Sequence, residues 1–263
     1  MTYLSYRWTG DRTTTPWVLL HAMPFDSTMF NKVRTYLPSV ITFDAPGFGE
    51  SLPGHELDGM LGVQEPSLDT YARAIAHDLE ELRARRFHIG GVSMGGAVTA
   101  AVVSLGVGHE GVALIDTNIG ADTEEAAKNR REAARKADEG DASSVLGMAD
   151  GMTAKATQQG RPEIYADIQR RLREVNPQSL AWMQRAMAAR PDRHDVLKDG
   201  IRALLLVRGD EDPTMSPTMI DRLAKEYPAT AVTKTIAAAG HFAPLETPSE
   251  LGEILADFTT QQL

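Results

Sequence analysis

Short, mainly apolar runs recur near both ends of the chain. They occupy residues 17–21, 40–44, 87–92, 111–116, 202–207 and 232–236. Runs of this length are typical of parallel strands that are buried on both faces. Between residues 67 and 85 the apolar positions instead recur at spacings of three and four, as on one face of a helix, and Ser67 is suited to its N-cap. Strand and helix patterns in alternation predict an α/β fold, with a doubly wound, mostly parallel sheet covered by helices.

Weaker patterns add an edge strand, a loop and further helices. Alternating polarity at residues 3–8, followed by Gly10, predicts the edge strand. Proline and glycine are frequent at residues 52–66, which we therefore expect to form a loop. Further helices are expected at residues 27–37, 217–226 and 249–258.

The middle of the chain shows no strand pattern. Helical segments are predicted at residues 122–138, 142–150, 162–175 and 178–190, with a short piece after Pro191. Because this insertion falls between two strands, where carboxyl ends meet, we expect a helical cap, or lid, over a site. A separate helical domain or a regulatory insert is the alternative. The predicted division is an α/β core of residues 1–119 and 199–263 and a cap of residues 120–198.

Composition and charge narrow the classes of partner. The net charge of −9 would repel a nucleic-acid backbone. Cysteine is absent, which excludes disulfides, thiolate nucleophiles and cysteine-bound metals. We see no signal peptide, and the apolar runs are far shorter than a membrane span. We therefore expect a soluble, cytoplasmic protein that acts on a small molecule, without nucleic acid or membrane; its oligomeric state is not readable from the sequence.

A serine nucleophile is predicted within residues 91–95, which read Gly-Val-Ser-Met-Gly. They fit the Gly-x-Ser-x-Gly pattern of a nucleophile elbow, a sharp turn between a strand and a helix. At such a turn the serine is held in a strained backbone conformation with its hydroxyl exposed at the sheet edge. Flanking glycines avoid a collision between a Cβ atom and the opposing backbone. Ser93 is the predicted nucleophile.

The serine needs a base, and the base needs an orienting acid. In doubly wound hydrolases the acid and then the histidine follow the serine along the chain. His241, in the loop after the last predicted strand, is in the right place for the base. The acid has three candidates: Asp210 and Asp212 follow the strand at residues 202–207, and Asp116 ends the strand at residues 111–116.

These landmarks together resemble the α/β-hydrolase fold superfamily, and the resemblance covers the chain nearly end to end. They are His-Ala-Met-Pro at 21–24, Asp-Ala-Pro-Gly-Phe-Gly-Glu-Ser at 44–51, the elbow, Gly-x-x-Asp at 209–212 and Gly-His at 240–241. The family pattern implies Asp212 as the acid and Asp210 as a carboxylate that braces the loop. It also implies an oxyanion hole made by the backbone N–H groups of Met23 and Met94. His21 is expected to brace the loop that carries Met23.

The nucleophile type decides among the reactions of this fold. Relatives that cleave haloalkanes or epoxides carry an aspartate at the elbow, so Ser93 favours an acyl-enzyme. We expect a serine hydrolase of a small carboxylic ester or lactone, with Ser93, His241 and Asp212 as its triad. C–C bond hydrolases and cofactor-free perhydrolases reuse the same triad, and some hydrolase-fold ligand receptors keep it with little turnover. Neither a metal nor a cofactor is expected, because the sequence lacks H-E-x-x-H, Walker and dinucleotide motifs.

Substrate-binding residues are expected on the helix at residues 178–190. Trp182, Met183 and Met187 could form an apolar pocket, and packing of this helix onto the core is the alternative. Residues 116–123 and 187–192 are similar to bacterial hydrolases grouped with 3-oxoadipate enol-lactonases. An anionic lactone would require a cap arginine. Several cap arginines are candidates, but residues 120–199 hold equal numbers of acidic and basic side chains, 14 of each, and enol-lactonases usually lack the His-x-x-Pro loop. The candidates are Arg130, Arg131, Arg170, Arg171, Arg185 and Arg190.

Overall fold

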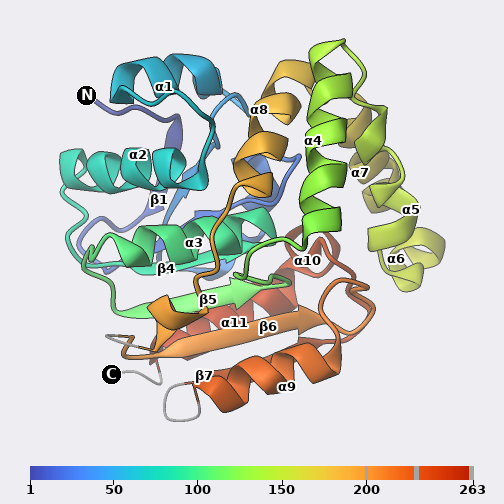
Figure 1. Ribbon diagram of the computed structural model, residues 1–263. Helices are drawn as coiled ribbons and strands as arrows, with labels where there is room; N and C mark the ends of the chain where they lie inside the picture. The colour runs from blue at the N-terminus through green and yellow to red at the C-terminus, as the bar shows by residue number, and fades with distance from the viewer. Residues whose placement is uncertain (199–200, 228–230, 261–263) are drawn as a thin grey trace.

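One seven-stranded sheet organises the described part of the chain. The computed structural model describes residues 1–198, 201–227 and 231–260. The strands lie in the order β1-β3-β2-β4-β5-β6-β7 (Figure 1). Their bounds are β1 (Tyr6–Gly10), β2 (Trp17–Leu20), β3 (Ser39–Phe43), β4 (His88–Val92), β5 (Gly111–Ile115), β6 (Leu204–Gly209) and β7 (Ala231–Ile236).

Strand pairing confirms the predicted doubly wound sheet. β1 pairs antiparallel with β3, and the other neighbouring strands pair in parallel. All residues of β2 to β6 are buried, as the apolar runs predict, whereas most of β1 and β7 is exposed at the two edges. The strands lie within two residues of their predicted positions except for the first edge strand, which is displaced toward residue 10.

Helices cover both faces of the sheet. α2 (Leu68–Glu81) and α3 (Met94–Ser104) pack together on one face, and α11 (Pro248–Thr260) packs against η2 (Val33–Tyr36) on the other (Figure 1). Ser67 caps α2 by accepting a backbone N–H, as predicted. The remaining core helices are η1 (Ser27–Phe30), α1 (Gly54–Leu61), α9 (Pro217–Glu226) and α10 (Ala243–Glu246). No helix in the described ranges combines the length and the apolar character needed to cross a membrane.

Two predictions about the core were wrong. Residues 52–66, expected to be a loop, contain the helix α1. Pro53 is its N-cap and Gly62 ends it with a φ of 67°, so the proline and the glycine mark the ends of a helix rather than a continuous loop. Residues 27–37, expected to form one helix, form the two short 3₁₀-helices η1 and η2.

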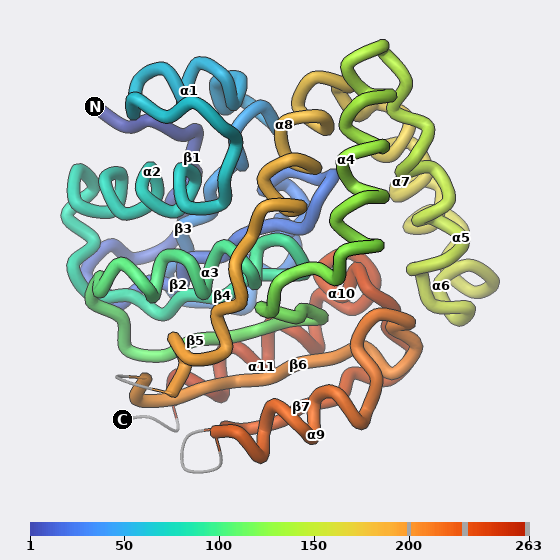
Figure 2. Tube along the Cα trace, in the orientation of Figure 1, coloured from blue at the N-terminus to red at the C-terminus, as the bar shows by residue number. Residues whose placement is uncertain are grey.

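Residues 120–198, which we call the cap, form helices only. These are α4 (Glu124–Asp138), η3 (Ser143–Val145), α5 (Met148–Met152), α6 (Lys155–Gly160), α7 (Pro162–Arg173), α8 (Pro177–Ala188) and η4 (His194–Leu197). α4 and α8 lie side by side, and most of the cap gathers beyond the carboxyl ends of β5 and β6 (Figures 1 and 2). α6 was not predicted, because its six residues carry no apolar period, and the predicted helix at 142–150 is divided into η3 and α5.

Candidate active site

Ser93 stands at a sharp turn between β4 and α3. Its backbone adopts φ 53° and ψ −115°, a conformation that non-glycine residues rarely take. A Cβ atom on Gly91 would lie 2.1 Å from the carbonyl carbon of Gly95, so the turn requires glycine there. The Ser93 N–H donates to the Ile115 carbonyl at 3.0 Å, and the Thr117 hydroxyl donates to the Ser93 carbonyl at 2.6 Å. The backbone therefore fixes the serine, while its side chain stays partly exposed.

His241 and Asp212 form a buried pair. His241 Nδ1 lies 3.1 Å from Asp212 Oδ2 and 3.0 Å from the Thr214 hydroxyl. Facing a carboxylate, Nδ1 is assigned as the N–H donor, which leaves Nε2 free to accept a proton. Ser93 and His241 line the same cavity. No hydrogen bond joins the two within the described residues, and such bonds commonly form only when substrate binds.

The three candidate acids occupy different positions. Asp212 contacts His241, whereas Asp210 is exposed and accepts the Ala239 N–H at 3.3 Å, as a loop-bracing carboxylate would. Asp116 is buried beneath the site and accepts the Gly209 N–H at 2.7 Å. The geometry therefore places Asp212, and not its two rivals, beside the histidine.

The environment keeps Asp212 charged. Burial raises the pKa of this carboxyl, but the hydrogen bond and the charge of His241 and the N–H of Thr214 lower it by more, so its pKa lies below the ordinary value. An ionised Asp212 can orient the imidazole and stabilise the imidazolium that forms when His241 takes a proton.

Asp116 has the opposite character. Burial, followed by the charge of Asp212, raises the pKa of Asp116 well above its ordinary value. Its Oδ2 is buried and has no hydrogen-bond partner among the described residues. The two aspartates therefore differ in character, because burial disfavours the charged form of Asp116, whereas the partners of Asp212 favour its charged form.

Two backbone N–H groups are available for an oxyanion. Met23 and Met94 both line the cavity that contains Ser93. Neither N–H donates to an acceptor within the described ranges. Met94 is the first residue of α3, so its N–H also lies at the positive end of the helix dipole. Both residues therefore lie at the cavity of Ser93, and their role as an oxyanion hole stays a prediction.

His21 holds the loop that carries Met23. Its Nε2 accepts the Ala45 N–H at 2.9 Å, and its Nδ1 lies 3.0 Å from the Ala22 carbonyl, which makes Nδ1 the protonated nitrogen. Burial lowers the pKa of His21 despite the bond to Ala22. A neutral imidazole therefore ties the β2 loop to the β3 loop, in agreement with the bracing role expected for it.

Glu246 is a site residue that the sequence analysis missed. Its buried carboxylate accepts the N–H groups of Gly240 and Phe242, on either side of His241, at 3.2 and 3.1 Å. Its other oxygen accepts the N–H of Ala154 and the hydroxyl of Thr157 in the cap, both at 2.9 Å. One acidic side chain thus joins the histidine loop to the cap. The signal that could have pointed to Glu246 is that it is the one acidic residue of residues 237–246, which are otherwise small or apolar apart from His241.

A cavity of about 330 Å³ lies between Ser93 and the cap. Met187 of α8 lines it as predicted, but Trp182 and Met183 do not, which corrects the sequence analysis. The Trp182 indole donates to Asp58 at 2.6 Å and covers Gly54, while Met183 is fully buried. These two side chains fasten α8 to the core. The apolar face of α8 is wide enough for one part to pack on the core while another part lines the cavity. Further lining residues are Met23, Thr117, Asn118, Ser144, Val145, Met148 and Met152.

Charged groups of the cap also line this cavity. Arg130 and Arg190 both do so, and both bind the carboxylate of Asp122 with N–O distances of 2.6 Å. Arg130 further donates to the side-chain carbonyl of Gln184 at 3.1 Å, and Arg190 to the Gly120 carbonyl at 2.8 Å. Burial lowers the pKa of Arg190, Asp122 raises it, and the neighbouring Arg130 lowers it further. Two guanidinium groups thus share one carboxylate at the cavity wall.

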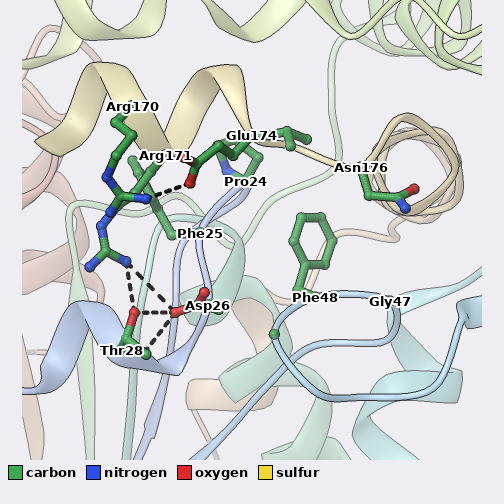
Figure 3. A pocket seen from close by; sticks show the side chains of 12 residues that line it. Pro24, Phe25, Asp26, Thr28, Gly47, Phe48, Arg170, Arg171, Glu174 and Asn176 are labelled. Carbon is green, nitrogen blue, oxygen red and sulfur yellow. Dashed lines mark hydrogen bonds and ion pairs between the residues drawn. The ribbon is translucent and has the colours of Figure 1, made fainter.

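A second cavity, of about 410 Å³, lies between the cap and the loops after β2 and β3 (Figure 3). It is lined by Pro24, Phe48 and the polar side chains of α7, and by none of the predicted catalytic residues. Arg171 reaches across it to the Thr28 hydroxyl at 2.7 Å and to Asp26 at 3.7 Å. The position of this second cavity makes it part of the contact between the cap and the core.

Metal-binding side chains do not gather in the described part of the chain. No group of three or more histidine, aspartate or glutamate side chains there could hold an ion.

A mostly parallel sheet, a serine at a strand-to-helix turn and a buried Asp-His pair after later strands define the α/β-hydrolase class. The model of the alpha/beta hydrolase family matches residues 17–254. The chain belongs to this family, as the sequence predicts.

Solved structures agree with this assignment. A thermophilic esterase from Thermogutta terrifontis, described with malate bound, has 27% sequence identity and a TM-score of 0.89, with 98% of this chain and 93% of that chain covered. The enol-lactonase from Burkholderia xenovorans LB400 has 20% identity and a TM-score of 0.78, with 98% and 96% covered. A bromoperoxidase from Bacillus anthracis has 19% identity and a TM-score of 0.80, with 98% and 95% covered. No curated protein sequence matches the chain significantly.

Proposed function

We propose that this protein hydrolyses a small carboxylic ester or lactone through an acyl-enzyme on Ser93. The observation that carries the proposal is the common cavity into which the elbow serine, His241 and two free backbone N–H groups open. The esterase at 27% identity supports an ester as the substrate class, and the enol-lactonase supports the same fold.

The reaction follows from the positions of these groups. His241 Nε2 takes the proton of the Ser93 hydroxyl while Oγ attacks the carbonyl carbon. The N–H groups of Met23 and Met94 donate hydrogen bonds to the carbonyl oxygen and so stabilise the negative charge that develops on it. His241 then gives the proton to the leaving alkoxide oxygen, and the C–O bond breaks to leave the acyl-enzyme.

The second half repeats these steps with water. Water loses a proton to His241 as it attacks the acyl carbon, and the proton returns to Ser93 Oγ when the acid departs. In a lactone the leaving alcohol stays attached to the acyl group. Throughout, the Asp212 carboxylate holds Nδ1–H and offsets the charge of the imidazolium.

Steady-state hydrolysis of a graded series of p-nitrophenyl esters and small lactones tests the proposal. We expect many turnovers for the wild type and a loss on the order of 10⁴-fold or more in Ser93→Ala. Ser104→Ala is a matched control, because Ser104 is exposed at the far end of α3 and, among the described residues, donates only to the Ala101 carbonyl. Retained activity in Ser93→Ala would move the nucleophile elsewhere. A single burst without turnover would favour a ligand receptor over an enzyme.

A further inference from the structure

We propose that Arg130 and Arg190 bind a carboxylate on the substrate, so that the preferred esters or lactones carry a second, acidic group. This inference rests on the proposed hydrolase function and concerns the same cavity. It depends on the charges that face the cavity, on how the two arginines are held, and on the size of the space.

The charges that face the cavity do not cancel. The charged or titratable side chains in its lining are Asp116, Arg130, Arg190 and His241. Asp116 is buried and accepts the Gly209 N–H, and its burial disfavours the charged form by raising its pKa. Asp122 lies behind the two arginines and supplies one negative charge to two positive ones. No other acidic side chain in the described ranges forms an ion pair with either arginine. One positive charge therefore remains at this wall.

The two guanidinium groups are held in place before any ligand binds. Arg130 uses Nε for Asp122 and Nη1 for Gln184, which leaves its Nη2 without a partner in the described part of the chain. Arg190 is fixed by Asp122 and by the Gly120 carbonyl, and its side chain is 8% exposed. Groups that are already ordered lose little conformational freedom when they bind an anion. A planar guanidinium also matches the two oxygens of a carboxylate.

The cavity brings this charge and the nucleophile within reach of one small molecule. Its volume of about 330 Å³ is at the low end of ligand pockets, which run from about 300 to 1,000 Å³. Ser93 and the arginines line the same space. A molecule that fills it would place its scissile carbonyl at Ser93 and another group against α4 and α8. The substrate class that fits is a monoester of a short dicarboxylic acid, or a lactone with a free carboxylate.

Three esters of the same chain length provide the test. Mono-p-nitrophenyl glutarate carries the carboxylate, p-nitrophenyl glutaramate replaces it with an uncharged amide, and p-nitrophenyl pentanoate removes it. We expect the wild type to have its highest kcat/KM with the glutarate. In Arg130→Gln, the ratio of kcat/KM for glutarate to that for glutaramate should fall about tenfold to a hundredfold, mainly through KM, as for loss of a charged hydrogen bond.

Two further variants separate charge from structural damage. Arg131→Gln removes the same charge from the next residue of α4, whose side chain is exposed, and should leave the ratio unchanged. Asp122→Asn removes the negative charge behind the arginines and should raise the ratio. A variant that merely loosens the cap would lower kcat/KM for all three esters together and leave the ratio as it was.

The outcomes distinguish this inference from the proposed function. Turnover of all three esters with no preference for the glutarate, or an unchanged ratio in Arg130→Gln, would overturn the carboxylate site and leave the hydrolase intact. Absence of Ser93-dependent turnover with every ester would overturn both. A glutarate preference that falls in Arg130→Gln and rises in Asp122→Asn would establish the site.

Discussion

The core and the cap hold their functional groups in different ways. In the core, Ser93 follows a buried strand, and hydrogen bonds of its own backbone fix it. In the cap, Arg130 and Arg190 are fixed by their side chains, through a shared carboxylate. In the reaction that we propose, the core would therefore set the geometry of the reacting atoms, while the cap would set the charge that a substrate meets.

The two regions meet at His241. Its backbone N–H donates to the Met152 carbonyl of the cap at 2.8 Å, and Glu246 binds both neighbours of His241 and the cap residue Ala154. A Cβ atom on Gly240 would lie 2.3 Å from the Met152 carbonyl oxygen, so the contact is close. The cap thus helps to hold the side chain that we propose as the base, as well as covering the cavity.

The largest expected effect compares two carboxylates of the core, one that contacts His241 and one that braces a loop. Asp212→Asn should lower kcat for an ester by about 10³- to 10⁴-fold, because the amide cannot stabilise the imidazolium and favours the wrong tautomer. The measurement is kcat at saturating ester, with the melting temperature as a check on folding.

Asp210→Asn is the matched control for this prediction. Asp210 lies two residues away and accepts only the Ala239 N–H in the described structure, so its loss should change kcat by far less. If Asp210→Asn were the more damaging of the two, the acid of the triad would have been assigned to the wrong carboxylate.

A medium effect concerns the pH dependence of stability. The folded-state pKa of Asp116 lies well above its unfolded value, so folding binds a proton that the unfolded chain releases. The stability that this proton provides is complete below about pH 4 and falls by about 1.4 kcal/mol per pH unit as the pH rises toward the folded-state pKa. Asp116→Asn has no such proton to lose, so its stability relative to wild type should increase with pH above about 4.

Urea unfolding of both proteins at about pH 5 and about pH 7 measures this difference, since the titration of groups other than Asp116 cancels in the comparison. The amide of asparagine can still accept the Gly209 N–H and donate toward Asp212, which limits other changes at the site. A difference in stability that stays constant with pH would mean that Asp116 titrates normally in the folded protein.

The same contrast explains which features could be predicted. Every strand of the sheet was anticipated from apolar runs, because burial on both faces leaves a continuous signal in the sequence. Asp212 and His241, which the structure places in contact, were singled out because each follows a strand in a fixed chain order. Features that are set by backbone topology are therefore readable from a single chain.

Features that depend on contacts between distant side chains were less readable. Trp182 and Met183 lie on the predicted apolar face of α8, but the sequence does not say which part of that face meets the core and which part meets the cavity. The nearly balanced charge of the cap, with 13 acidic and 14 basic side chains in residues 120–198, also hid the local excess of charge at Arg130 and Arg190. That excess arises because the single carboxylate of Asp122 pairs with both arginines. This sharing is determined by the packing of α4 against the end of α8, which the sequence does not show.

The smallest expected effect concerns the exposed fastening between cap and core. Arg171 of α7 reaches the Thr28 hydroxyl and Asp26, at the start of η1 (Figure 3). In the described part of the chain, its neighbour Arg170 instead forms ion pairs only with residues three and four positions away, Asp167 and Glu174. Arg171→Gln should therefore destabilise the protein more than Arg170→Gln, but by no more than about 1 kcal/mol, since ion pairs near the surface contribute little.

Urea unfolding measures the difference, which should shrink in about 0.5 M salt. A difference above about 2 kcal/mol that salt does not change would mean that Arg171 fastens the cap as firmly as a buried network does. The expected small value would leave buried contacts, such as those of Glu246 and Trp182, as the firmer polar links between the cap and the core.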